Sequence, residues 1–435
     1  MNIVKNRKQY LIYTFLIALI SSLLWGYGGM FSLGIMMILC AIVLFISNDI
    51  KLALPFFINF IFVNGTVAAT TNISIGTIVG VILLVAVILV YLIRNKVKFT
   101  LGKFGIPILI MAILFFIPIF WSGAKDFSYI FLYLAWSGYF VIYIFIVCSV
   151  KKDIKEELAM SMEGLSILLS LEGILSILRI ASTTGNFRDI YTLGWGICNE
   201  AGIMLILALP FTFYRLYKNF LKKECLYDLF VLILSMVGVL ATLSRGAYMF
   251  ALAEGCFLSL YFLWKKGYKK IFYIALSSGI LAIIAFVYIK YDWVLKHAID
   301  AIDDNGRFEL YEKALSIIKR NPLYFLFGAG MPFDVDIKDA VIVCHSTLYE
   351  TLACVGIVGL IVLIIHLYQK YLFVIKNKNI LNSMLLIGFI VIDIYGLIDN
   401  TYHMYYFMMI LMIILAIIEK TNKEEEASIW KGSFI

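Results

Sequence analysis

The sequence predicts an all-α fold, a polytopic membrane helix bundle, and three observations support this prediction. Hydrophobic residues make up 63% of the 435-residue chain and charged residues only 15%. The mean hydropathy is +0.97. Apolar segments long enough to cross a bilayer as helices recur along the whole chain. These features exclude an ordinary water-soluble domain.

Hydropathy predicts about fourteen spans, with twelve as an alternative because the first three segments are short and crowded. The segments are 10–24, 30–47, 52–68, 74–93, 106–121, 128–150, 158–180, 197–214, 228–243, 247–264, 271–289, 346–367, 381–397 and 401–418. They divide the chain into a bundle (1–289), an extracytoplasmic loop (290–345), a second part of the bundle (346–418) and a cytoplasmic tail (419–435).

The ends of the chain and its charge indicate how it sits in a membrane. No small-residue cleavage site precedes the second span, so we expect the first span to be a retained anchor. Most of the 36 Lys and Arg residues lie in alternate loops, including 94–103, 215–223 and 265–270. The positive-inside rule therefore predicts a multi-pass protein of the bacterial cytoplasmic (inner) membrane with both termini cytoplasmic. Orientation explains the net charge of +8 without a nucleic-acid partner.

Cysteine spacing and the long loop add further limits. The seven cysteines contain no CxxC pair, which argues against zinc and against a disulfide framework. In the loop, DDNGRFELYEKALSIIKRNP predicts a short amphipathic helix that Asp304 or Asn305 caps and that Pro322 follows. Its expected apolar face consists of Phe308, Tyr311, Leu315 and Ile318. The acids Asp334, Asp336 and Asp339 do not form an EF-hand pattern.

Several polar residues fall on the predicted outer side, where orientation normally depletes positive charge. They are Arg188, Asn199, Arg245, Arg307, His345, Glu350, Asp399 and His403. Arginine holds a diphosphate well because its planar fork makes paired, charge-assisted hydrogen bonds. A mostly apolar site lined by arginine near the membrane surface suits a lipid-linked phosphate.

Structural explanations compete with this interpretation. Arg245 could reach lipid headgroups or hydrogen-bond the carbonyls at the end of the preceding span. Arg307 could be an ordinary solvated residue, and His345 could simply lie near a helix start. Thr347 and Glu350 match a T-x-x-E capping box, which favours a structural role for Glu350.

The order of the motifs resembles the O-antigen polymerase and O-antigen ligase superfamily of bacterial surface polysaccharide assembly. The span ending in LATLSRGA, the loop segment GRFELYEKALSIIKRNPLYFLFGAG and the re-entry HSTLYETLACVGIVGL carry this resemblance. It is firmest over residues 190–365. Many members have asparagine after the histidine, whereas Ser346 follows His345 here, which weakens any role for a neighbouring amide.

The resemblance implies a membrane glycosyltransferase without a metal or other cofactor. The donor would be an oligosaccharide linked to undecaprenyl diphosphate, and the acceptor would be a glycan. Its family motifs place Arg245 and Arg307 on the donor diphosphate, with Asn199 and Arg188 as further members of that site. His345 matches the histidine before the re-entering span. Either His345 or a carboxylate, Glu350 or Asp399, could accept the proton of the acceptor hydroxyl.

Other functions remain open at the level of the sequence. We favour a polymerase over a ligase because polymerases are the more numerous and divergent of the two. A lipid-linked oligosaccharide flippase would also have about fourteen spans, but it needs no long outer loop. A peptidoglycan polymerase of the shape-and-division class would have such a loop, but its characteristic motifs are not identified in this sequence. Partners of a polymerase would include the lipid bilayer, a chain-length regulator and a separate flippase.

Overall fold

The computed structural model is helical, and it has no β-strand within the residues that it describes, which are 6–25, 29–65, 75–121, 127–183, 198–289, 307–330 and 344–432. The predicted all-α membrane bundle is confirmed. Each segment that hydropathy predicts as a span coincides with a helix. The first group is α1 (Arg7–Trp25), α2 (Gly29–Ser47), α3 (Ile50–Gly65), α4 (Ile75–Arg94), α5 (Gly105–Phe116), η1 (Ile117–Phe120), α6 (Phe127–Ser149) and α7 (Lys155–Thr183).

The second group of helices contains the segments that build the candidate site. It consists of α8 (Cys198–Asn219), α9 (Glu224–Ala241), α10 (Arg245–Lys265), α11 (Lys269–Ile289), α13 (Arg307–Lys319), α14 (Pro322–Phe327), α15 (Thr347–Lys376), α16 (Ile380–Tyr395), η3 (Thr401–His403) and α17 (Tyr405–Gly432). Among the described residues, α7, α8, α9, α10 and α15 are long and apolar enough to cross a membrane. The chain is thus a multi-pass membrane protein.

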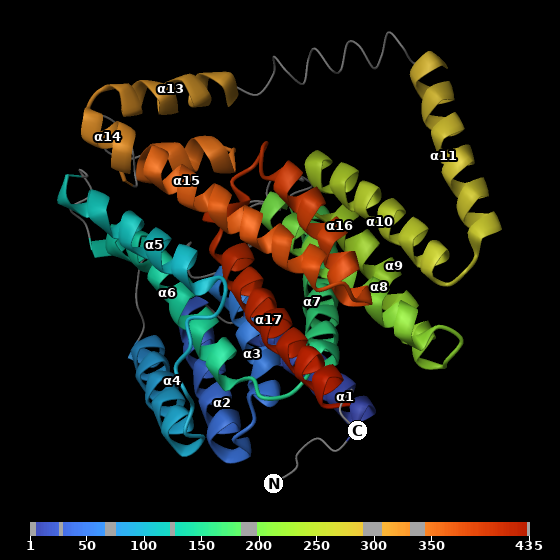
Figure 1. Cartoon of the computed structure of the whole chain (residues 1–435), viewed down its shortest axis with the longest axis horizontal. Helices are drawn as coiled ribbons and strands as arrows, with labels where there is room; N and C mark the ends of the chain where they lie inside the picture. The colour runs from blue at the N-terminus through green and yellow to red at the C-terminus, as the bar shows by residue number, and fades with distance from the viewer. Residues whose placement is uncertain are drawn as a thin grey trace.

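Two helices form the centre of the bundle. The side chains of α8 from Ile203 to Phe211 are at most 1% exposed, and those of α17 from Ile410 to Ile418 are fully buried. Helix α17 packs against α3, α6, α7 and α8 (Figure 1). It continues through the predicted cytoplasmic tail, where Glu419 accepts hydrogen bonds from the Lys103 amide at 2.9 Å and from the Tyr143 hydroxyl at 2.6 Å. The beginning of that segment is therefore part of the bundle.

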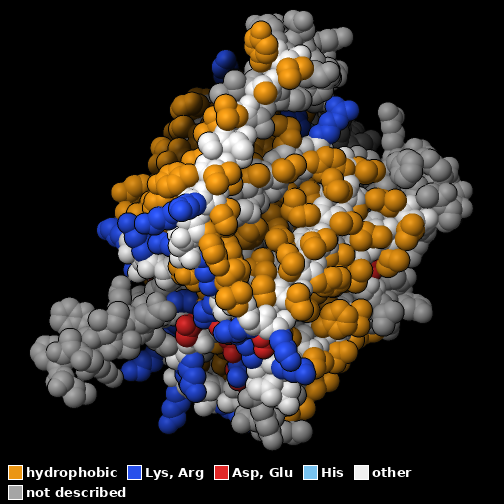
Figure 2. All heavy atoms as spheres, turned by 90° about the vertical axis from the view of Figure 1, so that its right-hand side faces the viewer, with side chains coloured by type: hydrophobic (Ala, Val, Ile, Leu, Met, Phe, Trp, Pro, Cys, Tyr) orange, Lys and Arg blue, Asp and Glu red, His pale blue; other side chains and the backbone are white. Residues whose placement is uncertain are grey.

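The outer surface of the bundle is apolar. Helix α11 contacts α10 near the turn that joins them and otherwise stands apart at the edge of the bundle (Figure 1). Figure 2 shows a broad hydrophobic surface on this face, with most Lys and Arg side chains gathered below it, toward the end at which the N-terminus lies. Such an apolar band with flanking charge is typical of a surface in contact with lipid.

Helix α15 is broken at Gly356, where φ is 69° and ψ is −169°. The break leaves carbonyl groups of the preceding turn without partners in the helix. Two of these carbonyls are taken by the loop after α14: the Ala329 amide donates to Ala353 at 2.8 Å, and the Gly330 amide donates to Cys354 at 3.1 Å. A Cβ at Gly328 would lie 2.2 Å from the Cys354 backbone, so only glycine allows this approach.

Helix α13 lies against α15, and its amphipathic character is confirmed. The buried face is formed by Ala314, Ile317 and Ile318, whereas Phe308 is 57% exposed. The predicted apolar face is therefore correct at Ile318 but wrong at Phe308, at the N-terminal end of the helix. The residues Asp304 and Asn305, predicted to cap this helix, lie outside the described residues. Asn321 is the N-cap of the following helix, α14, because its side chain accepts a hydrogen bond from the Leu323 amide at 2.9 Å.

The end of α8 carries a buried ion cluster that the sequence assigned to a loop. Arg215 is fully buried, and its Nη2 atom lies 2.8 Å from Asp228 on α9. Its Nε atom lies 2.5 Å from Glu163 on α7, which is also fully buried. Asn219 donates a hydrogen bond to Asp228 at 2.6 Å. This arginine thus joins three helices through its Nε and Nη2 atoms.

Candidate functional site

One end of the bundle collects polar side chains from four separate segments. The first residues of α8, α10 and α15 and the turn between α16 and α17 meet there, at the upper end of the view in Figure 1. The structure brings Asn199, His345, Glu350 and Asp399 together at this end, and Arg245 lies one residue beyond a side chain that contacts them.

Asp399 is the centre of this arrangement. Its side chain is almost completely buried, and its Oδ2 atom accepts a hydrogen bond from the Asn199 amide at 2.8 Å. Its Oδ1 atom accepts from the Asn400 backbone at 2.9 Å. The Asp399 carbonyl in turn accepts from the Thr347 amide at 3.0 Å. These contacts hold the carboxylate in one orientation against the starts of α8 and α15.

Ser244 links this carboxylate to the arginine-bearing helix. Its hydroxyl donates to the Asn199 side-chain oxygen at 2.6 Å and, as N-cap of α10, accepts from the Ala247 amide at 3.2 Å. The Tyr395 hydroxyl lies 3.4 Å away. A side chain at Gly246 would begin 3.1 Å from the Tyr395 ring, so the helix start is in close contact with the end of α16. A continuous series of polar contacts thus runs from Asp399 through Asn199 to Ser244.

Arg245 begins α10 directly after this cap, and its side chain is exposed. Within the described part of the chain, its guanidinium makes no hydrogen bond or ion pair. The proposed use of a helix C-terminus by Arg245 therefore has no support among these contacts. A guanidinium held at a helix start, without an acidic partner, is available to an anionic group.

His345 has a backbone conformation that few residues other than glycine adopt, with φ at 47°. Its Nδ1 atom lies 3.6 Å from Asp399 Oδ1, and about a third of its side chain is exposed. Leu243 has the same left-handed conformation (φ 54°), and it also stands directly before a serine N-cap. The chain therefore turns sharply at both helix starts, which places His345 beside the buried carboxylate.

Arg307 lies at the same end of the bundle, in the segment between α11 and α15. Tyr311, one turn later on α13, stacks on Tyr349 of α15 with ring centroids 4.2 Å apart. Burial raises the pKa of Tyr311, and the positive charge of Arg307 acts in the opposite direction. The charge of Arg307 also acts on the hydroxyl of Tyr395, the residue beside Ser244. Arg307 thus lies close enough to the end of α16 for its charge to be felt at Tyr395.

Glu350 is enclosed beneath this site, with 2% of its side chain exposed. The predicted capping box is not formed: Ser346 is the N-cap, its side chain makes no capping hydrogen bond, and Thr347 is the first helical residue. Glu350 instead accepts a hydrogen bond from the Cys344 amide at 3.3 Å. Burial raises the pKa of the Cys344 thiol to about 12. The contacts of Glu350 are those of a residue that secures the entry to α15.

The remaining predicted polar residues are Arg188 and His403. Arg188 lies outside the described residues, so its position relative to the site stays a prediction. His403 lies deeper, where its Nε2 atom is 2.9 Å from the Thr351 hydroxyl. The described residues contain no group of three or more His, Cys, Asp or Glu side chains arranged to hold a metal ion.

Sequence reasoning missed Ser244 and Tyr395. A signal for Ser244 was present, because serine directly before an apolar helical segment is a strong N-cap candidate. Tyr395 lies near the end of its predicted span, where aromatic residues commonly anchor a helix at the membrane interface. Its contact with the start of α10 depends on how α10 and α16 cross, which no local pattern describes.

Comparison with known families agrees with the resemblance drawn from the motifs. Residues 230–364 match the family model described as O-antigen ligase. The match includes Arg245, Arg307, His345 and Glu350, and it supports membership in the O-antigen ligase and polymerase superfamily. No curated protein matches the chain. The superfamily implies an enzyme that processes membrane glycans.

Proposed function

We propose, from this superfamily membership, that the chain is a polysaccharide polymerase of the bacterial cytoplasmic membrane. It would join repeat units carried on undecaprenyl diphosphate into an O-antigen or a capsular polysaccharide on the outer face of that membrane. Arg245, free of any described acidic partner, lies next to a buried polar series that ends at His345. This single observation supports the proposal best.

The two arginines would bind the donor diphosphate. The guanidinium of Arg245 has planar donors that match phosphate oxygens, and Arg307 approaches the same end of the bundle from α13. As the bond between the anomeric carbon and the diphosphate oxygen breaks, negative charge develops on the leaving lipid diphosphate. Fixed positive charge in a site with little water stabilises that charge.

His345 would accept the proton from the acceptor hydroxyl. Its Nδ1 atom faces Asp399, so its Nε2 atom is the one left to face a substrate. The acceptor oxygen then forms the new bond to the anomeric carbon, and the proton moves to Nε2. Asp399 would orient the imidazole, while Asn199 and Ser244 would position Asp399. In this proposal Asn199 supports the carboxylate through one amide hydrogen and leaves the other available to the diphosphate.

The second candidate is a ligase, which would use the same donor and transfer the finished chain to a different acceptor. The description of the matching family as O-antigen ligase favours it. A ligase and a polymerase would share the arginines and the histidine, because both must release a lipid diphosphate. They differ in the acceptor that receives the glycan.

The decisive experiment uses the full chain in proteoliposomes with a lipid-diphosphate-linked repeat unit. We expect products of increasing length without added nucleotide sugar. Arg245→Ala, Arg307→Ala and His345→Ala should each abolish them at unchanged protein level. Lys319→Ala, at the opposite end of α13 from Arg307, is the matched control and should retain the products.

Normal chain length in all three variants would overturn the proposed site. Passage of intact donor across the bilayer without extension would indicate a flippase. In a deletion strain, loss of polymer with one repeat unit still attached identifies a polymerase, whereas loss of all attachment identifies a ligase.

A further inference from the structure

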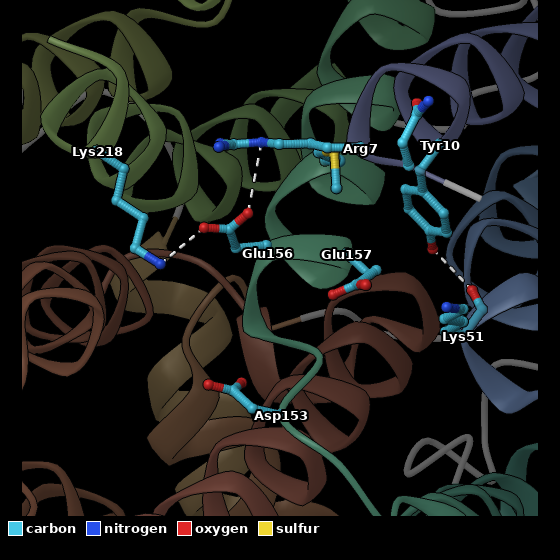
Figure 3. A pocket seen from close by; sticks show the side chains of 9 residues that line it. Arg7, Tyr10, Lys51, Asp153, Glu156, Glu157 and Lys218 are labelled. Atoms are coloured by element: carbon cyan, nitrogen blue, oxygen red, sulfur yellow. Dashed lines mark hydrogen bonds and ion pairs between the residues drawn. The ribbon is translucent and has the colours of Figure 1, made fainter. Parts of the chain in front are cut away.

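A second polar region lies at the other end of α8. A cavity of about 410 Å³ opens there, within the range of about 300–1,000 Å³ typical of sites for small ligands. Figure 3 shows its side chains, which come from the starts of α1, α3 and α7 and from the end of α8. They are Asn6, Arg7, Tyr10, Lys51, Asp153, Glu156, Glu157, Met160 and Lys218.

One side of this cavity has an excess of positive charge. A single carboxylate, Glu156, is shared by two cations: Arg7 Nε lies 3.4 Å away and Lys218 Nζ 2.7 Å away (Figure 3). Furthermore, the Nη2 atom of Arg7 is buried and makes no hydrogen bond within the described residues, and its Nε atom has only the ion pair with Glu156, which is too long for a good hydrogen bond. Buried donors without acceptors are costly, and a bound anion would supply the missing acceptors.

Another side of the cavity has an excess of negative charge. The carboxylate of Glu157 makes no ion pair within the described residues, and its position beside Tyr10 and Lys51 is seen in Figure 3. Asp153 accepts a hydrogen bond from the Lys155 amide at 2.9 Å, and it too makes no ion pair within the same part of the chain. Lys51 has its own partner, Asp49, at 3.6 Å. The cavity therefore presents separate groups of opposite charge.

The cavity also lies at the depth of the lipid headgroups. On α1, the exposed apolar residues Ile12, Leu16 and Ile20 follow at helical spacing, on the side of the helix that faces away from Arg7 and Tyr10. In a multi-pass membrane protein this face contacts lipid tails, so the first turn of α1 lies at the depth of the headgroups. A ligand could enter the cavity from the membrane surface.

We propose that this cavity binds a zwitterion that carries a phosphate and a primary ammonium group, as in an ethanolamine phospholipid headgroup. The phosphate lies between Arg7 and Lys218, which can donate to its oxygens. The ammonium group donates hydrogen bonds to Glu157 and Asp153. A quaternary ammonium group has no hydrogen to donate and is recognised by aromatic faces, and Tyr10 is the one aromatic residue of the lining.

The test compares headgroups and their two possible sources. The full chain is released from nanodiscs containing equal parts of ethanolamine and choline phospholipids, and retained lipids are counted by native mass spectrometry. Calorimetry measures binding of soluble glycerophosphoethanolamine and glycerophosphocholine to the detergent-solubilised chain. We expect the amine headgroup to be preferred. Preference with the lipid alone identifies a membrane ligand, and preference in both assays identifies a site that also accepts the free compound.

Variants assign the preference to this cavity. Glu157→Gln should weaken binding of the ethanolamine headgroup about tenfold, the size expected for one hydrogen bond to a charged group. Asp153→Asn should weaken it as well, while it keeps an oxygen for the Lys155 amide. The matched control is Glu224→Gln, an exposed residue at the start of α9, which should change nothing. Equal retention of both headgroups, or unchanged binding in the Glu157 and Asp153 variants, would overturn the proposal.

Discussion

Two arginines of the same bundle, Arg215 and Arg245, carry the same charge but differ in burial and in their acidic partners. Arg215 at the end of α8 is fully buried and is held by Glu163 and Asp228. Arg245 at the start of α10 is exposed and has no acidic partner within the described residues. An arginine held by two buried carboxylates stabilises helix packing, whereas one without a described partner is free to bind an anion. Pairing thus separates Arg215, a structural charge, from Arg245, which the proposed function assigns to an anionic ligand.

The largest expected effect is on the stability of the inner cluster. Arg215→Met leaves Glu163 and Asp228 buried without their cation, which should lower the free energy of unfolding by about 3–5 kcal/mol. Arg245→Met removes no described contact and should change it by less than about 0.5 kcal/mol. Denaturant titration in mixed micelles measures both values. Equal stability of the two variants would remove the distinction drawn between these arginines.

The next effect concerns the carboxylate beside His345. Asp399→Asn keeps an oxygen for the Asn400 amide, but it removes the charge that faces the imidazole and the oxygen that accepts from Asn199. If His345 is the proton acceptor, we expect the rate of polymer formation to fall about 10²-fold. The measurement is the initial rate of chain extension in proteoliposomes. A rate within twofold of the parent would show that Asp399 does not orient the histidine.

A smaller effect separates the two roles of Ser244. Ser244→Gly should cost α10 only a few tenths of a kcal/mol, since glycine is tolerated at an N-cap. It nevertheless removes the hydroxyl that bonds to Asn199. We expect about a tenfold lower rate, equivalent to one modest hydrogen bond, with partial recovery in Ser244→Thr. If the glycine variant loses stability and keeps its rate, the hydroxyl serves only as a cap.

The smallest expected effect tests how firmly α13 holds Arg307. Tyr311→Leu removes the stacking on Tyr349, which is worth about 0.5–1.5 kcal/mol. Hydrogen exchange of the α13 amides should become faster as the helix opens more often. Phe325→Leu on α14 is the control, since Phe325 is 49% exposed. Unchanged exchange in Tyr311→Leu would mean that other contacts hold α13 in place.

The sequence predicts most of the fold because each span carries its own hydrophobic signal. It also predicts that Asn199, His345 and Asp399 share one end of the bundle, because the direction of each span alternates. The burial of Arg215 was not predictable in the same way. Arg215 and Lys218 occupy similar positions at the end of one apolar segment, and only the rotation of α8 makes one buried and the other 43% exposed.

The break at Gly356 and the contacts of Ser244 were missed for a related physical reason. A glycine within an apolar segment is compatible with an unbroken helix, and only the loop at Ala329 and Gly330 shows why this helix is broken. The bond between Asn199 and Asp399 joins residues 200 positions apart. Such pairs depend on how helices cross, and one sequence contains no record of that geometry.

The long separation of Asn199 and Asp399 also has a consequence for biosynthesis. The chain enters the membrane from its N-terminus, so the turn that carries Asp399 is inserted after α8, α10 and α15 are already in place. Until that last turn is in place, His345 has no carboxylate beside it. Ser244, the N-cap of α10, is then not connected to Asp399 through Asn199. A nascent chain that stops before α16 would thus carry Arg245 and His345 but would lack Asp399. This residue faces His345 and bonds to Asn199, the partner of Ser244. A newly made molecule therefore completes its candidate site only when the final two helices are in place.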